Sequence, residues 1–166
     1  LTDCRVPKTM ILGEVNKGLH AFGSTVMQTY AYLAILSLGG AVGAYEEALR
    51  YTKERVHIGG KTLFENFQAV RHRLVNMYTE IEACRGLLYG CFEMMQQGKN
   101  GVKECMAAKI YAQQVHESVA SQAVMLHGGN GLMVDNGIER YFRESKMMAV
   151  GGFAVDIIRD QISMLL

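Results

Sequence analysis

The stretch that decides the fold runs from Phe67 to Gln96 and reads FQAVRHRLVNMYTEIEACRGLLYGCFEMMQ. Apolar residues recur in it at alternating spacings of three and four, which is the repeat of a helix that buries one stripe of side chains. The stripe consists of Phe67, Val70, Leu74, Met77, Ile81, Cys84, Leu88, Cys91 and Met95. The pattern therefore predicts a long amphipathic helix that forms one seam of a helical bundle.

The segment before this helix is the most apolar of the chain. Residues 21–45, AFGSTVMQTYAYLAILSLGGAVGAY, carry no charge, and about 20 apolar residues suffice to cross a bilayer. Scattered polar side chains dilute the apolar character, and Gly39, Gly40 and Gly43 suit close packing of helices. We therefore predict a buried bundle helix, continuing through EEALRYTKER, and no membrane span.

Two more helices follow. After the turn QGKNG, a helix from about Val102 to Leu126 is rich in alanine and is expected to end at Gly128 and Gly129. A fourth begins after VDNG, breaks at Gly151 and Gly152, and resumes in AVDIIRDQISMLL. The fold class predicted is all-α, an up-down four-helix bundle over residues 19–166, after a strand or loop at 1–18 that leads into it.

Composition excludes some classes of function. The 166 residues include 17 Lys and Arg against 16 Asp and Glu, interspersed along the chain, which gives no electrostatic footprint for nucleic acid. The cysteines lack CxxC spacing, so we expect no metal site and reduced thiols in the core of an intracellular protein. They are Cys4, Cys84, Cys91 and Cys105. Because the chain begins Leu-Thr-Asp-Cys without a signal-peptide pattern, we expect it to be a fragment of a longer protein.

Three motifs in a fixed order carry a resemblance. Residues 3–18, DCRVPKTMILGEVNKG, are followed by ALRYTKER at 48–55, then by a glycine pair at 59–60 and QAV at 68–70. The third motif is LHGGNGLMVDNGIERYFRESK at 126–146. In this order and near these separations they resemble the C-terminal helical domain of the acyl-CoA dehydrogenase family, along essentially the whole chain. Residues 1–18 then look like the exit from that family's middle β-domain.

The resemblance implies an FAD enzyme, usually a tetramer, which oxidises an acyl-CoA thioester. In the family a carboxylate removes the α-proton while the β-hydrogen leaves as hydride to the flavin. Electrons then pass to an electron-transferring flavoprotein. The expected location is cytoplasmic, or the mitochondrial matrix in a eukaryote.

The resemblance also implies cofactor-binding residues. Arg55 matches the arginine that reaches the FAD pyrophosphate of a neighbouring subunit, a role suited to its planar donors. Gln68 matches a glutamine near the adenine, although two more residues than usual separate it from Arg55. Gly128 and Gly129, next to His127, match glycines that let the backbone approach the adenosine. Without the resemblance, Arg55 would be a surface arginine and the glycines a helix C-cap.

The catalytic carboxylate of the family is missing. Aligned from YFRESK onward, the usual Y-E-G-T pattern becomes Gly151, Gly152, Phe153 and Ala154, which places Gly152 at the base position. Some family members carry the base on the first long helix instead, and Thr29 matches that position. Both base positions therefore lack a carboxylate.

Three hypotheses follow. The chain belongs to an active dehydrogenase whose base comes from elsewhere or whose pocket runs a variant flavin reaction. Alternatively, it is a non-catalytic subunit that keeps the fold while a paralogous partner supplies the base. The third alternative is a plain helical interaction module outside the family.

Overall fold

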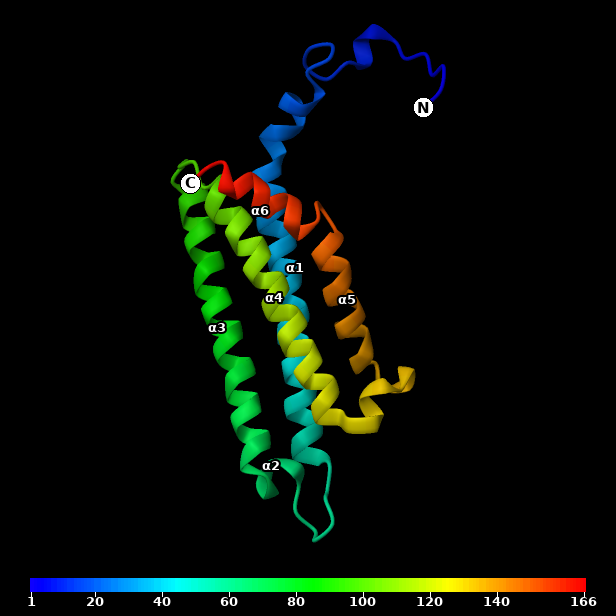
Figure 1. Ribbon diagram of the computed structural model, residues 1–166, viewed down its shortest axis with the longest axis vertical. Helices are drawn as coiled ribbons and strands as arrows, with labels where there is room; N and C mark the ends of the chain where they lie inside the picture. Colours follow the sequence, from blue (N-terminus) through cyan, green and yellow to red (C-terminus); the bar gives the residue numbers. More distant parts are fainter.

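Four long helices run side by side in the computed structural model, which spans residues 1–166 (Figure 1). The surroundings of every side chain are described except at positions 19, 20, 23, 24, 26 and 27. Successive long helices alternate in direction, and each packs against its neighbours. They are α1 (Gly18–Glu54), α3 (Gln68–Gln96), α4 (Val102–His127) and α5 (Ile138–Val150). The predicted up-down four-helix bundle is confirmed.

Short elements connect and close the bundle. Residues 151–154 separate α5 from the last helix, which lies across one end of the bundle, so the predicted break near Gly152 is also confirmed (Figure 1). Within the described residues, the isolated bridge between Val56 and Thr62 is the one β-type pairing. The short elements are η1 (Lys8–Met10), α2 (Leu63–Asn66), η2 (Gly128–Leu132), η3 (Val134–Asn136) and α6 (Val155–Ser163).

The apolar stripe of α3 forms one wall of the core. Its central positions are the buried ones: Leu74, Met77, Ile81, Cys84, Leu88 and Cys91. Val70 and Met95, near the two ends, are partly buried, and Phe67 caps the helix start with 37% of its surface exposed. The periodicity thus identifies the buried face, and the helix ends project beyond the core.

Helices α1 and α4 make the most extensive contact of the bundle, and glycines in α1 face side chains of α4 and α5. A Cβ at Gly40 would lie less than 3.0 Å from the ring of His116 in α4, and one at Gly43 would lie 2.9 Å from Tyr141 in α5. At Gly39 a Cβ would meet nothing within 4 Å. Close packing is therefore confirmed at Gly40 and Gly43, whereas the prediction for Gly39 is wrong because that position faces open space.

The cysteines divide between core and tail. Cys84, Cys91 and Cys105 are buried and free, and burial raises the pKa of Cys84 to about 11 and that of Cys105 to about 12. Cys4 is exposed, because residues 1–17 extend away from the bundle (Figure 1). The prediction of core cysteines is wrong for Cys4.

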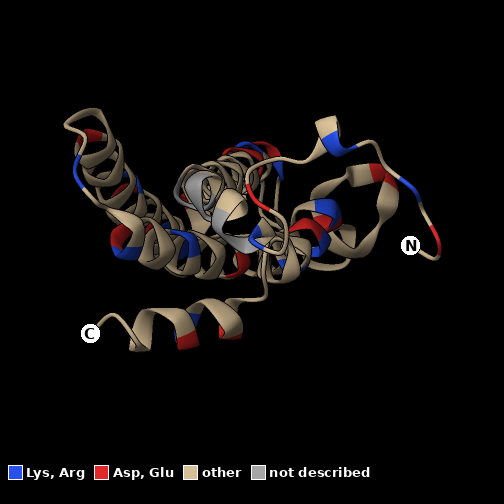
Figure 2. Ribbon diagram, turned by 90° about the horizontal axis from the view of Figure 1, so that it is seen from above, with Lys and Arg blue, Asp and Glu red and all other residues tan. Residues whose placement is uncertain are grey.

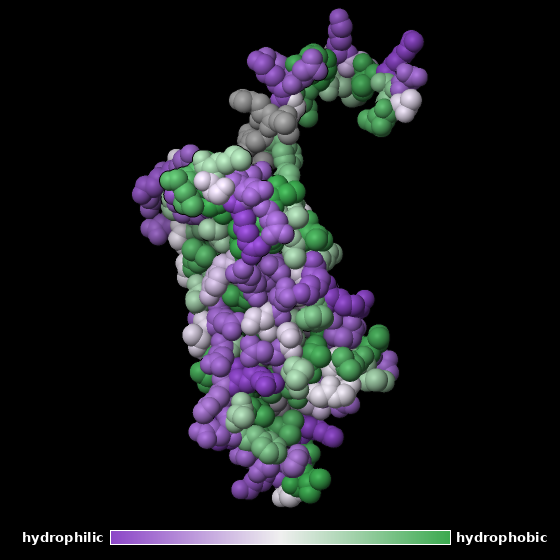
Figure 3. Space-filling model, viewed as in Figure 1, coloured by the Kyte–Doolittle hydropathy of each residue, from purple (hydrophilic) through white to green (hydrophobic). Residues whose placement is uncertain are grey.

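The surface is mixed in character. Seen from above, acidic and basic residues alternate over the bundle (Figure 2), and the face shown in Figure 3 scatters apolar side chains among hydrophilic ones. Many charges pair along their own helix, as Glu139 does with Arg143 at 2.5 Å. In the part of the chain that the structure describes, none of the helices is both long and apolar enough to cross a membrane.

Candidate functional site

The residues singled out by the sequence lie in two groups at opposite ends of the bundle (Figure 1). Arg55, Gln68 and the 127–129 turn lie where α1 and α4 end and α3 begins. Thr29, in the first part of α1, and Gly152, after α5, belong to the other end. We call the first group the turn cluster and the second the base-position cluster.

Tyr51 joins the two parts of the turn cluster. Its ring stacks on that of His127 with centroids 4.1 Å apart and an interplanar angle of 22°. The Tyr51 hydroxyl donates to the His127 carbonyl at 3.4 Å and accepts from Asn130 Nδ2 at 3.0 Å. Tyr51 was missed by the sequence analysis, although its place one turn before Arg55 in ALRYTKER was available as a signal.

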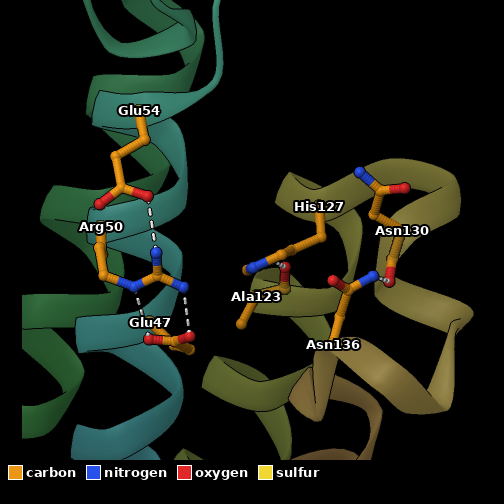
Figure 4. A network of polar contacts seen from close by, with 7 residues as sticks. All are labelled: Glu47, Arg50, Glu54, Ala123, His127, Asn130 and Asn136. Carbon is orange, nitrogen blue, oxygen red and sulfur yellow. Dashed lines mark hydrogen bonds and ion pairs between the residues drawn. The ribbon is translucent and has the colours of Figure 1, made fainter.

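His127 is a neutral, buried side chain. Its Nδ1 lies 2.8 Å from the Ala123 carbonyl, so Nδ1 carries the proton and Nε2 remains as an acceptor (Figure 4). Burial is the main cause that lowers the pKa of His127. Asn136 Nδ2 donates to the Asn130 carbonyl at 2.9 Å and fixes the following turn. His127 therefore positions the turn in its uncharged form.

The glycines of the turn differ in backbone conformation and in their surroundings. Gly128 ends α4 with φ +60°, the left-handed region that favours glycine, whereas Gly129 lies within η2 and is not left-handed. A Cβ at either would meet nothing within 4 Å, so the backbone is open there. The fold requires a glycine two residues on, because a Cβ at Gly131 would lie less than 3.0 Å from the Val124 carbonyl oxygen.

Arg55 is free to bind an external anion. It caps α1, its backbone N–H donates to the Tyr51 carbonyl at 2.8 Å, and its side chain is exposed. Its guanidinium forms no hydrogen bond or ion pair with the residues whose side chains are described. Arg50, five residues earlier, is held between Glu47 and Glu54 (Figure 4). Arg55 therefore differs from Arg50 in being unpaired.

Gln68 begins α3 and is exposed. A hollow of about 230 Å³ lies beside it, between the start of α3 and the end of α4. The hollow is lined by Leu63, Ala69, Val70, Arg73, Met125 and Leu126. An unpaired arginine, an open glycine backbone and this hollow therefore lie at the same end of the bundle.

The base-position cluster brings together two positions that are distant in the sequence. A Cβ at Gly152, which has φ +62°, would lie less than 3.0 Å from Leu33 Cδ1. Leu33 lies one helical turn after Thr29, whose hydroxyl donates to the Thr25 carbonyl of its own helix at 3.0 Å. The two family base positions thus face one region, and a carboxylate is present at neither.

Phe153 has a backbone conformation that glycine normally adopts. Its φ is +82°, and for a bulky residue this is an outlier that the surrounding structure must hold. Its ring packs near Phe22 at 6.0 Å and Tyr30 at 6.2 Å between centroids. The segment therefore has the backbone conformation suited to a glycine, with a ring added.

The nearest acid after this segment points to solvent. The Asp156 side chain is 90% exposed and pairs with Arg159 at 2.7 Å in the first turn of α6. This geometry does not place the Asp156 carboxylate in the region of Gly152 and Leu33. Among the described residues, no group of three His, Cys, Asp or Glu could hold a metal ion.

Comparison with known proteins decides the family. The model of the acyl-CoA dehydrogenase C-terminal domain matches residues 16–166. The chain belongs to the acyl-CoA dehydrogenase family. The resemblance seen in the sequence is thereby confirmed, and members of this family are flavoproteins with FAD as their general cofactor.

Individual relatives agree with this assignment. The chain is 35% identical over 150 residues to the caffeyl-CoA reductase-Etf complex subunit CarC of Acetobacterium woodii, covering 90% of this chain and 39% of that protein. It is 33% identical to the mitochondrial short/branched chain specific acyl-CoA dehydrogenase of Rattus norvegicus, covering 87% and 33%. Butyryl-CoA dehydrogenase from Megasphaera elsdenii superposes with a TM-score of 0.90 at 29% identity, covering 96% and 41%. The chain thus spans well under half the length of these proteins.

Proposed function

We propose that this chain is the C-terminal helical part of an acyl-CoA dehydrogenase-like flavoprotein that carries out FAD-dependent α,β-dehydrogenation of an acyl-CoA thioester. The observation that carries the proposal is the meeting of Gly152 and Leu33, which brings both family base positions to one region of the bundle. Residues 1–18 are assigned as the lead-in from a preceding β-domain. Residues 19–166 form the bundle domain.

The turn cluster is assigned to the cofactor. Arg55 would bind the pyrophosphate of the FAD of a neighbouring subunit, and Gly128 and Gly129 would let the adenosine portion of FAD approach the backbone. Gln68 lies at the adenine end, and His127 holds the turn through its bond to Ala123. When bound, FAD supplies the acceptor for the substrate's β-hydride. Electron-transferring flavoprotein is the proposed acceptor of the electrons, in keeping with the Etf complex named for the Acetobacterium woodii relative.

Removal of the α-proton requires a base from outside the two usual positions. Thr29 has no carboxylate and donates its hydroxyl proton to its own helix, while Gly152 has no side chain. Phe153 and Tyr30 lie next to each other in this region, but neither accepts a proton as a carboxylate does. In an active dehydrogenase, we therefore infer that the base comes from elsewhere, or that the pocket runs a variant flavin reaction.

A second candidate follows from the same geometry. A non-catalytic subunit of a heteromeric acyl-CoA dehydrogenase would need no base of its own. It would still present Arg55, exposed and unpaired, to the flavin of a paralogous partner. Family membership rules out the third alternative, a helical module outside the family. In either case we propose an assembly of like subunits, located in the cytoplasm or, in a eukaryote, in the mitochondrial matrix.

Counting flavin against chains in the purified full-length protein tests both candidates. One flavin per chain in a homo-oligomer supports the first. A half-complement of flavin, with a paralogous chain that co-purifies, supports the second. Absence of flavin from every form of the protein contradicts both.

A pair of variants tests the cofactor assignment. Arg55→Met is expected to lower the flavin content of the subunit whose pyrophosphate it contacts. Arg50→Met is the matched control, because Arg50 lies on the same helix and is occupied by Glu47 and Glu54. Equal flavin content in the two variants would contradict the role of Arg55.

A further inference from the structure

Lys109 is the largest charged side chain of the core. It lies in the first third of α4 with 1% of its surface exposed, next to small buried residues such as Ala108 and Ala112. A lysine is almost never fully buried unless its ammonium is paired. Its position therefore calls for a specific partner.

The partner is a backbone carbonyl in the base-position cluster. Lys109 Nζ donates to the Phe153 carbonyl oxygen at 3.0 Å, across 44 residues of sequence. In the part of the chain that is described, this is its one hydrogen bond, and no carboxylate pairs with it. Burial lowers the pKa of the Lys109 ammonium from its ordinary value, as expected for a cation without a counter-ion.

The acceptor belongs to the most strained residue of the cluster. Phe153 has φ +82° and follows Gly152 at φ +62°, so two successive residues occupy the left-handed half of the backbone map. Such a conformation persists in a bulky residue only where the surroundings hold it. The bond from Lys109 is a charge-assisted contact made directly to the carbonyl of that residue.

Backbone hydrogen bonds fix the two ends of segment 151–154. Among the described residues, the one hydrogen bond to its centre comes from Lys109. The Gly151 N–H donates to the Met147 carbonyl at 2.8 Å, which completes α5. On the other side, Tyr30 donates from its hydroxyl to Gln161 Oε1 at 3.0 Å, which ties α6 to α1. The Ala154 carbonyl accepts from the Ile158 N–H at 3.3 Å at the start of α6. At the centre, Gly152 packs against Leu33, and Phe153 makes its two ring contacts and accepts the bond from Lys109.

We propose that Lys109 is a positioning residue that holds Gly152 and Phe153, the centre of segment 151–154, in their left-handed conformation against α1, and so shapes the wall of the reaction site. This assignment rests on the proposed function only where it names that wall as part of the reaction site. Lys109 acts through Phe153, and no contact of its own with substrate is required.

Amide hydrogen exchange in the full-length protein tests the proposal without any ligand. Lys109→Met keeps the length and bulk of the side chain but removes the ammonium. We expect the amides of Gly151 and Ile158, whose hydrogen bonds close the two ends of the segment, to exchange about 10- to 100-fold faster, the range for one hydrogen bond to a charged group. Lys103→Met, at an exposed lysine of the same helix, is the matched control and should leave these amides unchanged. Equal exchange in the two variants would overturn the proposal.

A double-mutant cycle separates positioning from general loss of packing. Phe153→Gly removes the strain that Lys109 is proposed to hold. In that background, Lys109→Met should therefore accelerate exchange several-fold less than in the natural sequence. Strictly additive effects would assign Lys109 a packing role and overturn the proposal. Should Lys109→Met not fold, Lys109→Gln, which removes the charge and shortens the reach, takes its place with the same expectations.

The outcome is independent of the cofactor assignment. Flavin content is counted on the same samples, and it reports on the proposed dehydrogenase function. Protection of the Gly151 and Ile158 amides that depends on Lys109 supports the positioning role whatever the flavin count. Protection that does not depend on Lys109 overturns that role even in a fully flavinated protein.

Discussion

Replacing Gly152 by alanine should destabilise the protein through two separable effects. An alanine in the left-handed region costs roughly 1–2 kcal/mol. A Cβ at this position also lies less than 3.0 Å from Leu33 Cδ1, and displacing that side chain from its rotamer costs about 1 kcal/mol more. We therefore expect the free energy of unfolding to fall by about 2–3 kcal/mol.

Gly98 provides a matched control for the backbone effect alone. Its φ of +66° is close to that of Gly152, and a Cβ there would meet nothing within 4 Å. Gly98→Ala should therefore cost only about 1–2 kcal/mol. Urea unfolding followed by circular dichroism, at one protein concentration, measures both variants.

The contact between Gly152 and Leu33 is tested in a Leu33→Ala background. When Leu33 is first replaced by alanine, the excess cost of Gly152→Ala over Gly98→Ala should disappear. Equal costs of the two glycine variants in the natural sequence, or an excess that survives Leu33→Ala, would refute the placement of Gly152 against α1. The same packing predicts that Gly152→Glu will not restore dehydrogenation alone, because Phe153 and Ala154 remain and Leu33 obstructs the new side chain.

Two further predictions concern the contact between α1 and α4. Burial lowers the pKa of His116 to about 4, so its neutral form stabilises the fold fully above the ordinary pKa of 6.5, and this contribution is lost as pH falls toward 4. The loss should reach about 3 kcal/mol, measured by urea unfolding across that range, and should be absent in His116→Leu. Gly40→Ala should lower the free energy of unfolding by about 1–3 kcal/mol, because its Cβ meets the His116 ring. Gly39→Ala should raise the free energy of unfolding by about 1 kcal/mol, because a Cβ there meets nothing within 4 Å. A Gly39→Ala variant less stable than Gly40→Ala would contradict the packing.

Helix positions were predictable because one stripe of α3 repeats at helical spacing from Val70 to Met95. The break near Gly152 was predictable for a similar reason, since two glycines interrupt an amphipathic pattern. The buried face of α3 could be predicted from the periodicity of its apolar residues alone, because periodicity is a local property of the sequence. The exception, Gly39, shows that a glycine next to a tight contact is not itself part of that contact.

The candidate site was predictable only where a family pattern marked it. Tyr51 stacks on His127, and Lys109 reaches the carbonyl of Phe153, through contacts that join distant segments. The hydrogen-bond acceptor of Lys109 is a backbone carbonyl, and every residue has one. The sequence therefore did not indicate that Lys109 has a buried partner. The sequence showed a ring at Phe153, while its left-handed backbone emerged only from the fold.

The missing carboxylate is the central claim, and anaerobic mixing of the flavin-loaded, full-length protein with acyl-CoA thioesters tests it most directly. The visible absorbance of the flavin reports its reduction in a single turnover. A homo-oligomer of this chain, with Thr29 and Gly152 at the two base positions, is predicted to reduce its flavin with simple acyl-CoA thioesters far more slowly than a dehydrogenase that carries a carboxylate at either position. Rapid bleaching of the flavin in that homo-oligomer would contradict the claim.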